Sequence, residues 1–194
     1  MNILDIPDPP EIPKDIWPEI WKAQKELHEK YKAIEEKNRL GWGLPLDSFD
    51  IDDRSWQYYI KDMMWRVTEE LQEAKEAAEN SPHMFEELID ALHFLVELNI
   101  IVGLDPHNPY DRNLDYSYDD DPVYHLGIAA NCLKNKPWKN DFKETDEGKF
   151  LGHILDANTA LLTVLNYYGM DDEDIYILYF KKNQVNQFRI RSNY

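Results

Sequence analysis

Apolar residues recur along this chain every three or four positions rather than in alternation, and this spacing limits the fold more than any other feature. In the first long segment, for example, Ile20, Leu27 and Ile34 fall on one stripe of a helix. Only seven of the 194 residues are glycine, and no run with the alternation of a long strand is evident. We therefore expect an all-α protein, and a length of this order favours one domain.

Helix start and stop signals predict a single domain over residues 1–194 that contains six helices. A proline-rich arm, residues 1–13, precedes the helices, and an irregular Asp-rich loop, residues 105–122, separates the third from the fourth. Asp53 or Ser55 is expected to cap the second helix, which then runs to about Asn80. The other five helices are predicted over residues 17–40, 84–102, 123–134, 148–168 and 171–191.

The charge balance and the cysteine count exclude several functions. With 38 acidic and 21 basic residues the net charge is -17, which argues against binding nucleic acid through bulk positive charge. No apolar stretch is long enough to span a bilayer, and the first residues lack the features of a signal peptide. The single Cys132 cannot form an intrachain disulfide. We expect a cytoplasmic protein with neither a nucleic-acid nor a membrane partner.

Four carboxylates occur as two pairs at helical i, i+3 spacing: Glu70 with Glu73 on the second helix, and Glu87 with Asp90 on the third. If these helices pack side by side, the four charges repel one another unless a cation neutralises them, and oxygen ligands suit Mg²⁺ or Mn²⁺. The alternative is an ordinary solvated acidic face, paired with nearby lysine or arginine.

Two segments resemble each other, which predicts a duplicated helical hairpin. Residues 88–105 match residues 154–171 at an offset of 66, and a weaker match at an offset of 55 covers the preceding helices. The second copy is degenerate, because its equivalent positions hold Tyr124, His125, Ile128, His153 and Asp156. The alternative is that two amphipathic helices look alike through their periodicity alone.

The last helix carries Lys182, Asn186 and Arg189 at i, i+4 and i+7, and therefore on one face. Two cations and an amide on one face suit a phosphorylated sugar and its base. The alternative is a basic helix end that complements the helix dipole, although this does not account for Asn183 and Asn186.

The pattern Glu69-Glu70-x-x-Glu73 followed by Glu87-x-x-Asp90 resembles the signature of the all-α nucleoside triphosphate pyrophosphatases, the MazG-like and dimeric dUTPase superfamily. The closing stretch, residues 179–189, reads YFKKNQVNQFR and is similar to the last helix of dimeric dUTPases and phage dCTPase-dUTPases. The resemblance implies a helical bundle built on a MazG-like hairpin whose second copy is degenerate.

The resemblance also implies roles for individual residues. Glu70, Glu73, Glu87 and Asp90 are the implied Mg²⁺ ligands, with Glu73 orienting or deprotonating water and Glu69 as a second catalytic candidate. The implied substrate-binding residues are Gln24, His93, Lys136, Lys139, Lys182, Asn183, Asn186 and Arg189. Alternatively, Gln24 and His93 are satisfied polar groups of the bundle, and the two lysines of the Lys136-Pro137-Trp138-Lys139 segment only follow the end of a helix.

We therefore expect Mg²⁺-dependent hydrolysis, with Mn²⁺ as a substitute, of a deoxynucleoside triphosphate to the monophosphate and pyrophosphate. dUTP is the first expected substrate; dCTP, or both pyrimidines, is the alternative, since an amide such as Gln24 can flip. The resemblance implies a homodimer and is compatible with phage origin, hence the host cytoplasm. A rival of another class is a non-catalytic acidic helical protein that mimics DNA through residues 115–121 and 171–174 and needs no metal.

Overall fold

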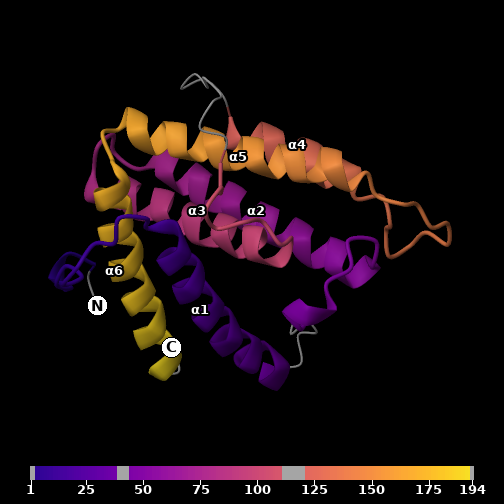
Figure 1. Ribbon diagram of the computed structural model, residues 1–194, viewed down its shortest axis with the longest axis horizontal. Helices are drawn as coiled ribbons and strands as arrows, with labels where there is room; N and C mark the ends of the chain where they lie inside the picture. The colour runs from indigo at the N-terminus through magenta and orange to yellow at the C-terminus, as the bar shows by residue number, and fades with distance from the viewer. Residues whose placement is uncertain (1–2, 39–43, 111–120, 193–194) are drawn as a thin grey trace.

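The computed structural model describes residues 3–38, 44–110 and 121–192, and within them every regular element is helical (Figure 1). This confirms the predicted all-α class. The helices are α1 (Trp17–Asn38), α2 (Arg54–Glu76), α3 (Pro82–Ile101), α4 (Pro122–Cys132), α5 (Glu147–Tyr167) and α6 (Asp172–Arg191), with short 3-10 helices η1 (Ile3–Asp5) and η2 (Leu46–Ser48).

The helices are arranged around a central pair, α2 and α3, which pack along each other. The α4/α5 pair lies along one side of this central pair, whereas α1 and α6 cross its other side (Figure 1). Most of α3 is buried, including its polar residues Glu87, His93, Glu97 and Asn99, because α1, α2, α5 and α6 all pack against it. Since α1, α2 and α6 all pack against α3, polar residues on these three helices converge with those of α3.

Two buried amides join the central pair to the α4/α5 pair. Asn99 on α3 and Asn158 on α5 are 1% and 3% exposed, and each amide nitrogen donates to the other's oxygen, at 2.9 and 3.0 Å. This reciprocal pair satisfies four polar atoms inside an otherwise apolar contact.

Capping side chains define the starts of α2 and α3. Asp53, rather than Ser55, caps α2: its Oδ1 accepts hydrogen bonds from the backbone nitrogens of Ser55 and Trp56, at 2.8 and 3.1 Å. Ser81 caps α3 in the same way, accepting from the backbone nitrogen of Met84 at 3.1 Å. Pro82 follows it in the first helical turn, where its missing N–H costs nothing.

The second helix ends earlier than the sequence predicts. It stops at Glu76 instead of Asn80, because Ala77 adopts an extended conformation with ψ 158° and Asn80 a left-handed one with φ 56°. These residues form the short turn that brings α3 back along α2.

Two glycines end α3 and α5. Gly103 and Gly169 have φ of 74° and 83°, which any residue with a Cβ adopts only with strain. In each case the next backbone nitrogen bonds back into the helix, to the Asn99 oxygen at 2.9 Å and to the Leu165 oxygen at 3.1 Å. The two helix ends are alike, which is compatible with the predicted repeat; duplication itself stays a hypothesis.

The proline-rich arm packs onto the bundle through η1, which contacts α6, and through an ion pair of 2.6 Å between Asp8 and Lys181. Most of the predicted Asp-rich loop, residues 111–120, lies outside the described residues, as do residues 39–43 and 193–194. Among the helices of the described chain, none has both the length and the apolar character needed to cross a membrane.

Candidate active site

The predicted acidic residues of α2 and α3 converge where these helices run side by side. Carboxylate oxygens of Glu70, Glu73 and Glu87 all lie within 4.8 Å of one another. Glu87 is buried, Glu70 is partly buried and Glu73 is exposed, so the cluster runs from the bundle interior to its surface. His83, which the sequence analysis did not single out, adds a neighbour, with its Nδ1 3.0 Å from Glu87 Oε1.

Crowding of these carboxylates makes the cluster a site for positive charge. Burial, together with the negative charges of Asp90, Glu87 and Glu73, raises the pKa of Glu70 to about 8. At neutral pH the cluster therefore retains a proton that a cation can replace. A donor set made only of carboxylate oxygens fits a hard divalent ion such as Mg²⁺.

Asp90, the fourth predicted ligand, is engaged by a lysine. Its Oδ2 lies 2.6 Å from Lys182 Nζ, which also donates to Glu86 Oε1 at 2.6 Å. Burial raises the pKa of Asp90 to about 6, although the Lys182 ammonium acts in the opposite direction. Lys182 is only 3% exposed, so the two carboxylates compensate a charge that is largely withdrawn from solvent. Asp90 as a metal ligand and Lys182 as a phosphate ligand stay predictions.

Glu69, the second catalytic candidate, is held on the outer side of α2. Its carboxylate accepts hydrogen bonds from Trp65 Nε1 at 2.9 Å and from Arg66 at 3.2 Å. It is not a member of the three-carboxylate cluster. Its catalytic role stays a prediction.

A pocket of about 440 Å³ adjoins the acidic cluster, between α1, α2, α3 and α6. Aromatic side chains, including Tyr31 and Phe94, supply much of its apolar wall, and Arg189 contributes a cation. The structure thus brings six predicted site residues into one pocket: Gln24, Glu70, Asp90, His93, Asn186 and Arg189. Pocket size and mixed lining are typical of small-molecule sites.

Hydrogen bonds fix the orientation of the Gln24 amide in this pocket. Its Oε1 accepts from Tyr179 Oη at 2.6 Å and lies 3.0 Å from His93 Nδ1, and its Nε2 donates to Glu97 Oε2 at 3.0 Å. Burial lowers the pKa of His93 to about 3, so this ring is neutral and lies stacked on Tyr179. One N–H of the Gln24 amide is left over from these contacts.

Two residues of this network, His28 and Glu97, were missed by the sequence analysis. Both are buried, and His28 Nδ1 contacts Glu97 Oε1. Burial lowers the pKa of His28, but the hydrogen bond and charge of Glu97 outweigh it, so the pKa lies above 6.5. Their positions gave a signal, since each follows a predicted site residue, Gln24 or His93, by one helical turn.

The other predicted substrate ligands lie elsewhere. Lys136 lines a separate pocket of about 300 Å³, and its Nζ is 6.0 Å from the centre of the Trp138 ring. Lys139 is exposed and lies outside both pockets. Asn183 is buried on α6, and within the described part of the chain its amide nitrogen has no hydrogen-bond partner. Their roles stay predictions.

A family model described as dUTPase matches residues 72–194, well over half of the chain. The chain belongs to the dUTPase family. No curated protein and no solved structure matches it significantly. Family membership together with the all-helical fold identifies a dUTPase-type, all-α nucleoside triphosphate pyrophosphatase, an enzyme class that generally uses Mg²⁺.

The dUTPase match includes Glu73 and all of α3 to α6, hence Glu87 and the basic face of the last helix. It begins after Glu70 and does not include Gln24. The assignment of these two residues therefore rests on their positions in the pocket and the acidic cluster, not on the family match.

Proposed function

We propose that the protein hydrolyses dUTP to dUMP and pyrophosphate with Mg²⁺ bound by Glu70, Glu73 and Glu87. The observation that carries the proposal is the position of this cluster beside the pocket that Gln24 and Arg189 line, in a member of the dUTPase family. A nucleotide with its base near Gln24 and its phosphates near the carboxylates would span both features.

The three carboxylates suit Mg²⁺, because they offer hard oxygen ligands that lie within 4.8 Å of one another. Without the ion, the raised pKa of Glu70 keeps a proton in the cluster at neutral pH, and the ion would replace it. When bound, Mg²⁺ neutralises phosphate charge and makes coordinated water more acidic. Glu70, Glu73 and Glu87 would hold the ion. Glu73, the exposed member of the cluster, orients the attacking water and accepts its proton on a carboxylate oxygen. Asp90 is the proposed fourth ligand.

Base selection follows from the amide orientation. With Gln24 Nε2 donating to Glu97 and Oε1 accepting from Tyr179, the group left for a ligand is an N–H donor. A donor suits the O4 carbonyl of uracil and not the N4 amine of cytosine. This argument favours dUTP over dCTP, the alternative substrate, although an amide released from its partners would serve either base.

The phosphates are proposed to lie between the acidic cluster and the cations of the pocket. Arg189 on α6 and Lys32 on α1 line the pocket together with Glu70. A guanidinium binds phosphate oxygens through paired hydrogen bonds. On this proposal Asn186 contacts the sugar, one turn before Arg189 on the same helix face.

We also propose a homodimer. The pocket that Lys136 lines has three exposed aromatic walls, Tyr58, Trp65 and Trp138, whose exposed fractions are 51%, 60% and 76%. Exposed apolar side chains grouped in this way are typical of protein contacts. Across such a contact, Lys136 and Lys139 could reach a phosphate in the partner's active site. Size-exclusion chromatography with light scattering would show a dimer, and Trp138→Ser would shift it towards monomer.

The first experiment is pyrophosphate release from dUTP, dCTP, dTTP, dATP, dGTP and UTP, with Mg²⁺ and with EDTA. We expect metal-dependent release that is fastest with dUTP. Glu73→Gln should lower kcat by about 100-fold or more, the size typical of a lost general base. Glu76→Gln, an exposed carboxylate of α2 outside the cluster, is the matched control and should retain full activity. Full turnover in Glu73→Gln would overturn its assignment.

A further inference from the structure

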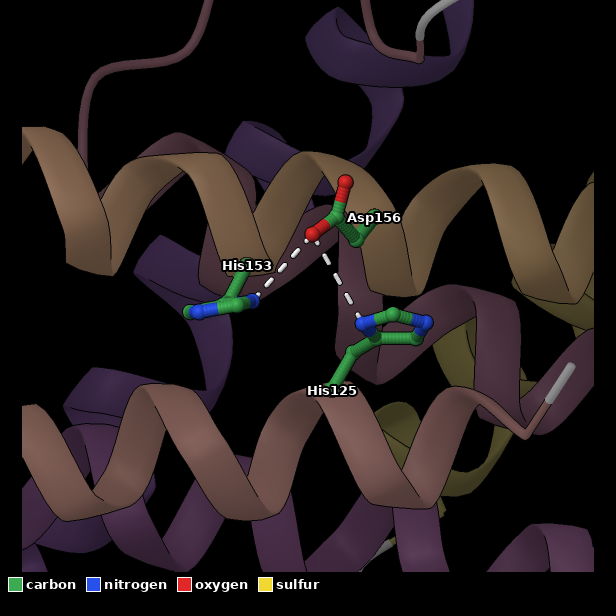
Figure 2. A group of neighbouring side chains, drawn as sticks. All are labelled: His125, His153 and Asp156. Carbon is green, nitrogen blue, oxygen red and sulfur yellow. Dashed lines mark hydrogen bonds and ion pairs between the residues drawn. The ribbon is translucent and has the colours of Figure 1, made fainter. Parts of the chain in front are cut away.

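A second cluster of metal-ligand side chains lies on the α4/α5 pair, away from the acidic cluster. His125 projects from α4, and His153 and Asp156 project towards it from one face of α5 (Figure 2). The three side chains are 13%, 23% and 27% exposed, so they are mostly enclosed yet remain accessible to an ion.

The spacing of these groups is close to that of ligands on one metal ion. Asp156 Oδ2 lies 3.1 Å from His153 Nδ1 and 3.6 Å from His125 Nδ1, and one ligand atom from each residue falls within 4.8 Å of the others. Ligand atoms on a tetrahedral Zn²⁺ are about 3.3 Å apart, given bond lengths of about 2.0–2.1 Å. Small rotations of the imidazole rings, whose centres are 6.2 Å apart, would complete this geometry.

We propose that His125, His153 and Asp156 form a transition-metal site that binds Zn²⁺. Two imidazoles and one carboxylate favour Zn²⁺ or a similar first-row ion, whereas the all-carboxylate cluster on α2 and α3 favours Mg²⁺. Three protein ligands leave a position for water, which the exposure of the site permits. The site goes beyond the proposed hydrolysis of dUTP and does not depend on it.

The register of the two hairpins supports a ligand role for these positions. The 66-residue offset that aligns them pairs Glu87 with His153 and Asp90 with Asp156, and the 55-residue offset of the preceding helices pairs Glu70 with His125. Two of the three clustered carboxylates, Glu70 and Glu87, therefore correspond to His125 and His153. The third, Glu73, corresponds to Ile128, and Asp156 corresponds instead to Asp90, the carboxylate that pairs with Lys182. The exchange of ligand type changes which metal the position prefers.

A bound ion would cross-link α4 and α5. These two helices are joined in sequence only through residues 133–146, which contain no helix. Because His125 comes from one helix and His153 and Asp156 from the other, metal binding would oppose their separation during unfolding.

The test is Zn²⁺ binding to the full-length, chelator-treated protein, measured by competition with a chromophoric chelator in excess Mg²⁺. We expect one equivalent of tightly bound Zn²⁺, and a rise in Tm when it is added. His125→Gln, His153→Gln and Asp156→Asn should each weaken binding by about 100-fold or more, at least the loss seen when second-sphere partners of metal ligands are removed. Substitution with Co²⁺ should give the intense visible absorption of a four-coordinate ion.

Two control variants test whether Zn²⁺ binds at this site or at other metal-binding side chains. His107→Gln removes an exposed histidine that pairs with Asp15 on another part of the surface, and Glu73→Gln disrupts the acidic cluster. Both should retain the tight equivalent of Zn²⁺, and far-UV circular dichroism would establish that each variant is folded. Wild-type protein without a tight equivalent would overturn the proposal, as would binding that is lost in Glu73→Gln but kept in folded His125→Gln and Asp156→Asn.

Discussion

Replacing Glu97 by glutamine tests whether the buried network around Gln24 holds α1, α3 and α6 together. The substitution preserves shape but replaces one carboxylate oxygen with a donor NH₂ group. The carboxylate contacts His28 through Oε1 and accepts from Gln24 through Oε2. If the new oxygen stays on His28, the new NH₂ faces the Gln24 NH₂, and two donors oppose each other. If Gln24 flips instead, the Tyr179 hydroxyl loses its acceptor.

Either arrangement leaves one buried donor unpaired, which costs about 1–3 kcal/mol. In addition, a charge-assisted contact between His28 and residue 97 becomes a neutral one, a loss of about 1 kcal/mol. Glu97 and Gln24 are 5% and 6% exposed, so solvent offers little compensation. We therefore expect Glu97→Gln to lower the free energy of unfolding by about 3 kcal/mol.

Urea denaturation at two pH values measures this loss and its origin. The pKa of His28 is raised in the folded protein, so the stability that its charge contributes is fully present below about pH 6.5 and is lost as pH rises through the folded-state value. The difference between wild type and Glu97→Gln should therefore be larger at pH 6 than at pH 9.

The matched control is Glu35→Gln, a partly buried carboxylate that lines the same pocket outside this network. Burial raises the pKa of Glu35, so its neutralisation should be harmless or stabilising. A loss in Glu97→Gln below about 1 kcal/mol, or equal losses in the two variants, would refute the network argument.

Three further predictions concern other contacts of the structure. Asn99→Leu and Asn158→Leu should each cost about 3 kcal/mol because each strands a buried amide, whereas the double variant should cost less than their sum; additive losses in chemical denaturation would contradict the reciprocal pairing. Because the pKa of Glu70 is raised to about 8, Mg²⁺ affinity measured by calorimetry should rise about tenfold per pH unit towards pH 8 and then level off. An affinity that does not change with pH would show that the cluster holds no proton that the ion replaces. Asn135→Ala should lower stability by about 3 kcal/mol, since this buried amide bonds to Asp52 and Lys143 backbone groups at 2.8–2.9 Å, and an unchanged Tm would refute its role in holding the segment after α4.

Local features of the sequence determined the class of fold and most helix boundaries. Hydrophobic periodicity together with start and stop signals predicted six helices, and the described residues form six α-helices. Asp53, one of the two predicted caps of the second helix, is the residue that caps it. The i, i+3 spacing likewise predicted which carboxylates share a helix face. These features depend on residues within one or two turns of one another, and a sequence displays such neighbours directly.

Tertiary packing decided which of these faces meet and therefore what each polar group does. Lys182, whose role as a phosphate ligand stays a prediction, pairs with Asp90 in the folded chain, and Gln24 is oriented by Tyr179 on the last helix. His28 and Glu97 form a buried pair between helices that are far apart in sequence. Such pairings depend on how α1 and α6 pack against α3, because a buried polar atom is stabilised by a hydrogen-bond partner from a neighbouring helix. The spacing of residues along a helix does not tell which residue of another helix will be the partner. That partner is set only when folding brings helix faces that are distant in sequence into one pocket.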